Sequence, residues 1–280
     1  MKKVLIVGDT RKKKIKDTLK ELVSWLKKRA QTVPMDIAEA EQAALLEGDF
    51  AIALGGDGTF LRVSRMVSPF GIPIIGVHLG LFGFLAELTP EDMYSYLDKI
   101  LRDEYEINTR MLLNCRLERN GKVVNESLGV NDAVISRASL ARLISIRLFI
   151  DEEDVTVYSS DGLVVSTPLG STAHSLAAGG PILSPQMDAF VVSPICPHTL
   201  TNRPLVISAE SRLEMEVGSE GTGVGLTVDG QVYEELEPGD MIRVERSDTR
   251  LKLVDAGIRS FYAVLREKLS WGGSAKYGNG

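Results

Sequence analysis

Cysteine is scarce in this sequence: among 280 residues, only Cys115 and Cys196 carry a thiol. The two lie far apart and outside any Cys-x-x-Cys pattern, so nothing indicates a disulfide framework or a zinc site. We expect both to be small, buried, apolar residues.

Long apolar runs are absent as well. None approaches the roughly 20 residues that a membrane-spanning helix needs, and the apolar run after Lys2 and Lys3 is too short for the core of a signal peptide. An excess of positive charge is also missing, since the formal net charge is −6, which argues against nonspecific nucleic-acid binding. The sequence therefore predicts a cytoplasmic protein that binds neither membrane nor nucleic acid.

Two common phosphate-binding patterns do not occur. The sequence has no Gly-x-x-x-x-Gly-Lys-Ser/Thr, which argues against a P-loop nucleotide hydrolase. No Gly-x-Gly-x-x-Gly follows the first apolar run, so a standard dinucleotide-binding fold at the N-terminus is disfavoured.

The first part of the chain, residues 1–104, alternates between two kinds of periodicity. Short apolar runs, such as 4–7, 50–54 and 72–77, are separated by segments with apolar residues at helical spacing. Such alternation predicts an α/β domain with a parallel sheet and helices on its faces.

The second part, residues 105–254, has apolar residues that alternate with period two. Asn120-Gly121 and Asp229-Gly230 are typical hairpin turns between such runs. We therefore expect a mainly β domain with antiparallel hairpins. In residues 255–280 we expect one more helix, which packs back on the first domain, and then a loose glycine-rich tail.

The most informative motif is Gly-Gly-Asp-Gly-Thr at residues 55–59, directly after the apolar run 50–54. Glycines let a phosphate approach the backbone, and the helix expected from Phe60 would turn its N-terminus to the same loop. Asp57 can hold a metal or accept a proton there. A tight turn capped by Asp57 is the alternative, but capping does not require three glycines around one aspartate. The motif predicts a phosphate site.

Two later segments carry polar groups that suit a nucleotide. The apolar run 163–165 leads into a stretch rich in serine, threonine and glycine that ends near residue 181. Those residues give many hydrogen bonds without bulk, although an ordinary loop has the same composition. Asn131 and Asp132 can bind an adenine edge and a ribose diol, and the same pair is also common in turns.

Together these segments and the run 197–204, Pro-His-Thr-Leu-Thr-Asn-Arg-Pro, resemble the NAD kinases over about residues 50–235. The first motif also occurs in lipid kinases and phosphofructokinase-like enzymes, whereas the order of all four is more specific. The resemblance implies phosphorylation of the 2′-hydroxyl of the adenosine ribose of NAD. It also implies ATP or polyphosphate as donor, Mg²⁺ or another divalent cation, and a homo-oligomer, dimer or tetramer.

The resemblance also implies roles for individual residues. Asp57 is the expected catalytic carboxylate, and no side chain is named as a metal ligand. The residues expected to bind NAD or the donor are Gly55, Gly56, Gly58, Thr59, Arg62, Asn131, Asp132, Arg142, Ser159, Asp161, Thr172, Ala173, His174, Ser175, Leu176, Ala177 and Gln231.

Two positions depart from the pattern of the family. His174 stands where the family usually has tyrosine, and His78 stands where it usually has asparagine. Two alternatives remain: a lipid kinase, which the polar residues 166–175 disfavour, and an NAD-binding regulator without catalysis, which Asp57 disfavours.

Overall fold

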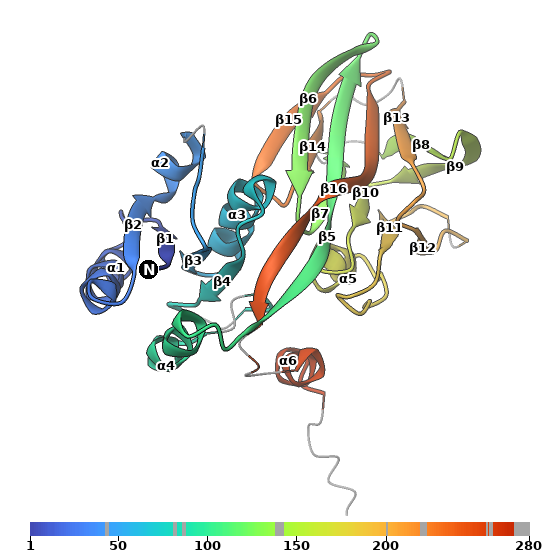
Figure 1. The fold of residues 1–280 in the computed structure, drawn as a ribbon. Helices are drawn as coiled ribbons and strands as arrows, with labels where there is room; N and C mark the ends of the chain where they lie inside the picture. The colour runs from blue at the N-terminus through green and yellow to red at the C-terminus, as the bar shows by residue number, and fades with distance from the viewer. Residues whose placement is uncertain are drawn as a thin grey trace, which may run out of the picture. The chain divides into compact units, whose positions relative to one another are not determined.

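The computed structural model describes residues 1–42, 45–80, 83–85, 88–137, 143–199, 201–218, 223–255, 257 and 260–271. The chain divides into two compact units (Figure 1). Unit 1 consists of Met1–Asn108 and Leu253–Gly280, and unit 2 of Thr109–Lys252. In the described part of the chain, no helix is long and apolar enough to cross a membrane.

Unit 1 is built on a parallel sheet with the strand order β2-β1-β3-β4 (Figure 1). Leu253 of β16 adds a parallel pairing beside Ile74 of β4. The predicted α/β domain with a parallel sheet is therefore confirmed. Its strands are β1 (Lys3–Gly8), β2 (Gln31–Asp36), β3 (Phe50–Leu54) and β4 (Ile74–Val77), and its helices are α1 (Lys13–Leu26), α2 (Ile37–Gln42), α3 (Asp57–Val67), α4 (Pro90–Leu101) and α6 (Phe261–Lys268).

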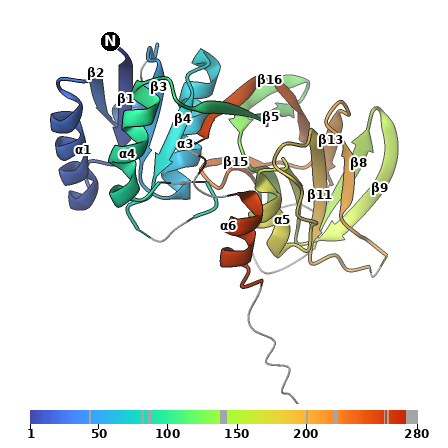
Figure 2. The same ribbon diagram turned by 60° about the horizontal axis from the view of Figure 1, so that its bottom comes forward.

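Helices cover both faces of this sheet. The Trp25 and Tyr94 rings lie 5.2 Å apart, which places α1 and α4 side by side (Figure 2). On the other face, Arg62 of α3 forms an ion pair with Glu41 of α2. All five residues of β3 are buried, as expected for a central parallel strand covered on both sides.

Two elements of unit 1 differ from the prediction. Strand β2 was not predicted, because its side chains are mostly half-buried and Pro34 interrupts the pattern. Proline is tolerated in this strand since it lies at the edge of the sheet, with β1 as its only neighbour in the strand order. Helix α3 begins at Asp57, earlier than the predicted start at Phe60.

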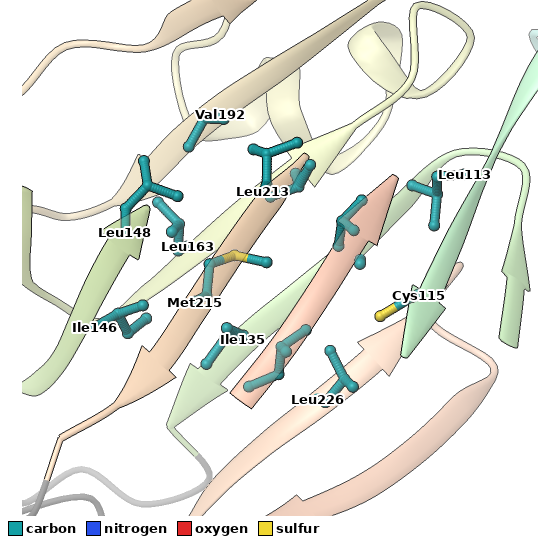
Figure 3. Packing of buried hydrophobic residues seen from close by; sticks show 14 of the residues in the cluster. Leu113, Cys115, Ile135, Ile146, Leu148, Leu163, Val192, Leu213, Met215 and Leu226 are labelled. Carbon is teal, nitrogen blue, oxygen red and sulfur yellow. The ribbon is translucent and has the colours of Figure 1, made fainter. Parts of the chain in front are cut away.

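Unit 2 contains two sheets that share one hydrophobic core. One has the order β12-β11-β10-β7-β14-β15, and the other contains β9, β8, β13, β16, β5 and β6. Figure 3 shows Leu148 and Met215 of one sheet packed with Leu163 and Val192 of the other. The strands are β5 (Glu106–Arg119), β6 (Lys122–Gly129), β7 (Asp132–Arg137), β8 (Ile144–Ile150), β9 (Glu153–Ser160), β10 (Gly162–Ser166), β11 (Ala189–Ile195), β12 (Leu205–Ser208), β13 (Leu213–Val217), β14 (Val224–Val228), β15 (Val232–Leu236) and β16 (Met241–Asp255), with one short helix, α5 (His174–Ala177).

The two predicted hairpin turns are present. Asn120 and Gly121 join β5 to β6 with φ of 53° and 72°, and Asp229 and Gly230 join β14 to β15 with φ of 52° and 64°. Positive φ at both central residues is the type I′ geometry that suits the twist of antiparallel strands. The predicted mainly β character of this part of the chain is confirmed.

The two cysteines have different environments. Cys115 is buried in the core of unit 2, where burial raises the pKa of its thiol to about 12. Cys196 is exposed, so the expectation that both would be buried is wrong for this residue. It follows the end of β11 and has φ of 45°, which places it in a surface turn.

Candidate functional site

The glycine loop of unit 1 joins β3 to α3. The Gly55 N–H donates to the Val77 carbonyl at 3.0 Å, which ties the start of the loop to β4. A Cβ on Gly55 would collide with the side chain of Thr59, whereas a Cβ on Gly56 would have nothing within 4 Å. The loop is therefore closely packed at Gly55 and open at Gly56, where the backbone is exposed.

Asp57 is the first residue of α3, and Gly56 is the N-cap. The Asp57 carboxylate accepts hydrogen bonds from the N–H groups of Phe84 at 2.8 Å and Leu85 at 3.2 Å. A Cβ on Gly83 would collide with the same carboxylate. Asp57 is thus not the helix cap of the alternative interpretation. Its carboxylate is oriented by residues 83–85.

Arg62 lies one turn into α3. Its guanidinium forms two hydrogen bonds with the Glu41 carboxylate, and this interaction lowers the pKa of Glu41 and raises that of Arg62. The ion pair joins α3 to α2. A contact between Arg62 and substrate stays a prediction.

The Asn131-Asp132 pair of unit 2 lies where β6 leads into β7, and both residues are buried. Burial raises the pKa of Asp132 to about 7, the negative charge of Asp229 adds to this effect, and a main-chain hydrogen bond from His174 opposes it. Two buried oxygens, Asn131 Oδ1 and Ser166 Oγ, have no hydrogen-bond partner among the residues that the structure describes. These two oxygens therefore have capacity to accept a hydrogen bond beside the Asp132 carboxylate.

Residues 167–177 pack against this pair. The Thr167 hydroxyl donates to the Val130 carbonyl at 2.7 Å, and the Thr167 N–H donates to the Asn131 carbonyl at 2.8 Å. A Cβ on Gly170 would collide with Asn131. The structure therefore brings together two segments that the sequence identified separately.

The short helix α5 continues the same segment. The Ser175 hydroxyl lies 3.1 Å from that of Ser193 in β11, and Gly180 fits there because a Cβ would collide with Ser175. Ser175 is buried, Thr172, Ala173 and Leu176 are half-buried, and His174 and Ala177 are exposed.

The remaining predicted residues have structural partners of their own. Asp161 forms an ion pair with Arg137 at 3.0 Å, the Ser159 carbonyl accepts from the His198 N–H at 2.9 Å, and the exposed Gln231 donates its N–H to Val228 at 3.0 Å. Arg142 lies outside the described residues.

Some residues around these segments were missed in the sequence. Asp229 was interpreted only as a turn residue, although its carboxylate contacts the segment before Asp132. The run from His78 to Leu85 resembles the family pattern and departs from it at His78, and nothing in the sequence indicated that the N–H groups of Phe84 and Leu85 bind Asp57. In the described part of the chain, no group of three or more His, Cys, Asp and Glu side chains could hold a metal.

Comparisons with known proteins identify the same two parts of the chain. Residues 36–105 match the family model of the ATP-NAD kinase N-terminal domain, and residues 130–256 match that of the ATP-NAD kinase C-terminal domain. An NAD kinase of Geotalea daltonii is 39% identical over 97% of this chain and 99% of its own. An NAD kinase of Koribacter versatilis is 40% identical over the same shares.

Two solved structures have a similar fold. A yeast NADH kinase complexed with NADH has a TM-score of 0.87 at 24% identity, over 98% of this chain and 89% of its own. An NAD kinase from Archaeoglobus fulgidus in complex with ATP has a TM-score of 0.74 at 24% identity, over 96% and 98%. With both domain models matched in order and relatives at about 39% identity over nearly the whole length, this chain belongs to the NAD kinase family.

Proposed function

We propose that this protein transfers the terminal phosphate of ATP to the 2′-hydroxyl of the adenosine ribose of NAD and so makes NADP. The observation that carries this proposal is the Asp57 carboxylate, oriented by two N–H groups at the start of α3, directly after an open glycine loop. The relatives named NAD kinase and the ATP-bound neighbour support NAD as acceptor and ATP as donor.

The donor's phosphates belong to unit 1 in this proposal. Gly56 has open space around its Cα, and the N-terminus of an 11-residue helix adds positive potential where the phosphates would lie. Polyphosphate and ATP both carry a chain of negatively charged phosphates joined by anhydride bonds. The loop alone therefore gives no reason to prefer one donor over the other.

A divalent cation fits this site as a partner of the donor. Mg²⁺ is commonly held by substrate phosphates together with one or two carboxylates, and Asp57 offers one. A protein cage of three or more ligands was not found among the described residues. When bound, the ion neutralises charge on the transferring phosphoryl group.

Asp57 acts on the acceptor hydroxyl. An ionised carboxylate is purely an acceptor of hydrogen bonds, so Asp57 can accept the hydrogen of the ribose 2′-hydroxyl. The bond between that oxygen and the γ-phosphorus forms as the bond to the β-phosphate oxygen breaks. The proton passes to Asp57, and ADP leaves.

The acceptor belongs to unit 2. Asn131 and Asp132 supply an amide and a carboxylate for the hydroxyl and amide groups of NAD. Asp161, Ser159, Gln231, Arg142 and residues 172–177 complete the proposed contacts. The polar character of residues 166–175 opposes an apolar acceptor such as a lipid.

The test compares the full chain with Asp57→Asn, which preserves size and removes the negative charge. NADP formation is measured with ATP and Mg²⁺, and the Kd of NAD is measured by calorimetry. Loss of a general base typically lowers kcat by about 10²–10⁴-fold. We expect NAD affinity to change less than about twofold, because the amide of the variant keeps an oxygen that can accept the hydrogen of the 2′-hydroxyl. Asp17→Asn, an exposed carboxylate of the same unit, is the control.

Near-normal turnover of Asp57→Asn would contradict the assignment. If the wild type phosphorylates a lipid and not NAD, the protein is a lipid kinase. If it binds NAD but forms no NADP with either ATP or polyphosphate, it is an NAD-binding regulator without catalysis. We also infer a cytoplasmic homo-oligomer, to be tested by cell fractionation and light scattering.

A further inference from the structure

Asp229 lies at the tip of the β14–β15 hairpin and contacts the Asn131-Asp132 segment. Its carboxylate accepts from three successive N–H groups: Val130 at 3.0 Å, Asn131 at 2.7 Å and Asp132 at 3.2 Å. One carboxylate thus holds every main-chain donor of this segment. Charge-assisted bonds of this kind are stronger than neutral ones.

The carbonyl groups of the same three residues are also held. Thr167 donates to the carbonyls of Val130 and Asn131, and the Asp229 N–H donates to that of Asp132 at 2.9 Å. The backbone of residues 130–132 is therefore bound on its donor side by Asp229 and on its acceptor side mainly by Thr167. Of the two polar side chains, Asn131 has an oxygen without a partner among the described residues, and Asp132 accepts from the His174 N–H.

The hairpin turn alone does not require this carboxylate. The β5–β6 hairpin has the same pair of positive φ values, with Asn120 in place of Asp229. Asn120 is exposed, whereas Asp229 is 8% exposed. A type I′ turn accepts asparagine or aspartate equally well, so the turn does not account for a buried carboxylate at this position.

The position is also unfavourable for a second negative charge. Asp229 and Asp132 are both buried and interact repulsively. Like charges that share a buried site destabilise each other. The three hydrogen bonds to residues 130–132 offset this repulsion, and they act on the geometry of the Asn131-Asp132 pair.

We propose that Asp229 is a positioning residue for NAD: by binding the three N–H groups of residues 130–132, it sets the orientation of Asn131 and the charge of Asp132 toward the dinucleotide. The inference rests on the proposed function, because it takes Asn131 and Asp132 as NAD contacts. Asp229 itself acts through them and does not touch the reacting atoms.

The second part of this role concerns the charge of Asp132. Among the described residues, the groups that act on its carboxylate are the Asp229 carboxylate on the hairpin and the main-chain N–H of His174 on α5, while Ser166, opposite on β10, is uncharged. The pKa of Asp132 is about 7, and the negative charge of Asp229 contributes to this value. Removing the charge of Asp229 lowers it, so Asp132 becomes fully ionised at a more acidic pH.

Two variants separate these effects in the full chain. Asp229→Asn preserves the turn and one oxygen and removes the charge, and Asp229→Gly preserves the positive φ and removes the whole side chain. Asn120→Gly is the control, since it removes the side chain at the corresponding turn position of the other hairpin, outside residues 130–132. KM and kcat are measured for NAD and ATP between about pH 5.5 and 8.5, a range that spans the titration of Asp132.

We expect KM for NAD to rise about tenfold or more in both Asp229 variants, as the loss of charge-assisted hydrogen bonds usually has an effect of this size. KM for ATP and all constants of Asn120→Gly should stay within about twofold. In Asp229→Asn, the inflection of KM for NAD against pH should move to more acidic pH, because the charge of Asp229 is one of the causes that raise the pKa of Asp132. A merely structural role would not move this inflection.

The inference fails if Asp229→Asn has wild-type KM for NAD, or if KM rises while the inflection stays in place. Thermal unfolding checks that each variant is folded, and Asp229→Asn decides alone if Asp229→Gly is too unstable to assay. The proposed function has a separate test, because it is contradicted only if the wild type itself forms no NADP.

Discussion

At the scale of single residues, Asp132 is a buried carboxylate with a strongly raised pKa. Its pKa of about 7 results first from burial and then from the charge of Asp229. The cost of ionising it falls on the folded protein alone, because the unfolded chain exposes the side chain to solvent. The stability of the protein without ligand should therefore depend on pH through this residue.

The sign of that dependence follows from the two pKa values. Because the folded pKa lies above the ordinary value of 3.8, the folded protein binds a proton that the unfolded chain has released, and stability falls as pH rises from about 3.8 to about 7. Asp132→Asn cannot ionise and escapes this loss. We expect its Tm, relative to the wild type, to be higher at pH 8 than at pH 5, measured by calorimetry without NAD.

The matched control is Asp161→Asn, a half-buried carboxylate of the same unit that pairs with Arg137. Its Tm difference from the wild type should not increase from pH 5 to pH 8. A Tm difference for Asp132→Asn that is constant over this range would mean that Asp132 ionises in the folded protein as easily as in water.

At the scale of elements, the position of the Asp57 carboxylate, which we propose as catalytic, depends on a segment that follows β4. Residues 83–85 supply the two N–H groups that orient Asp57, and Gly83 lies so close that any Cβ would collide with that carboxylate. We expect Gly83→Ala to displace the carboxylate and to lower kcat by about tenfold or more, since small misplacements at a reacting centre have large effects.

Gly80→Ala is the control for this change, because a Cβ there has nothing within 4 Å. Steady-state kinetics with ATP and NAD measure both variants, and circular dichroism checks that they are folded. Equal kcat for Gly83→Ala and the wild type would mean that the bonds from residues 83–85 do not set the working position of Asp57.

Some parts of the candidate site could be predicted from the sequence, and others could not. The loop at residues 55–59 was predicted because a buried strand, three glycines and a helix are adjacent in the chain. The β14–β15 turn was predicted from Asp229-Gly230. The N–H groups that the Asp229 carboxylate binds, however, lie 97 to 99 residues earlier in the chain. Local periodicity carries no information about such a partner, and the strand β2 was missed since its half-buried edge position weakens the same periodicity.

At the scale of the whole molecule, the chain has two units, each with its own core. In the proposed function each unit binds one substrate. The glycine loop of unit 1 binds the phosphates of the donor, and residues 130–132 and 167–177 of unit 2 bind NAD. The expected division at residues 104 and 254 stays a prediction, because the compact units by themselves do not establish independent folding.

Hydrogen exchange on the full chain can test this division of the substrates. Bound ligands slow exchange where they contact or order the backbone. We expect a non-hydrolysable ATP analogue with Mg²⁺ to protect residues 55–60, and NAD alone to protect residues 130–132 and 167–177. The N–H groups of residues 130–132 already bind Asp229, so their exchange without ligand should be slow and should accelerate in Asp229→Gly. Protection of residues 55–60 by NAD alone, with none at 130–132 or 167–177, would reverse the assignment of donor and acceptor to the two units.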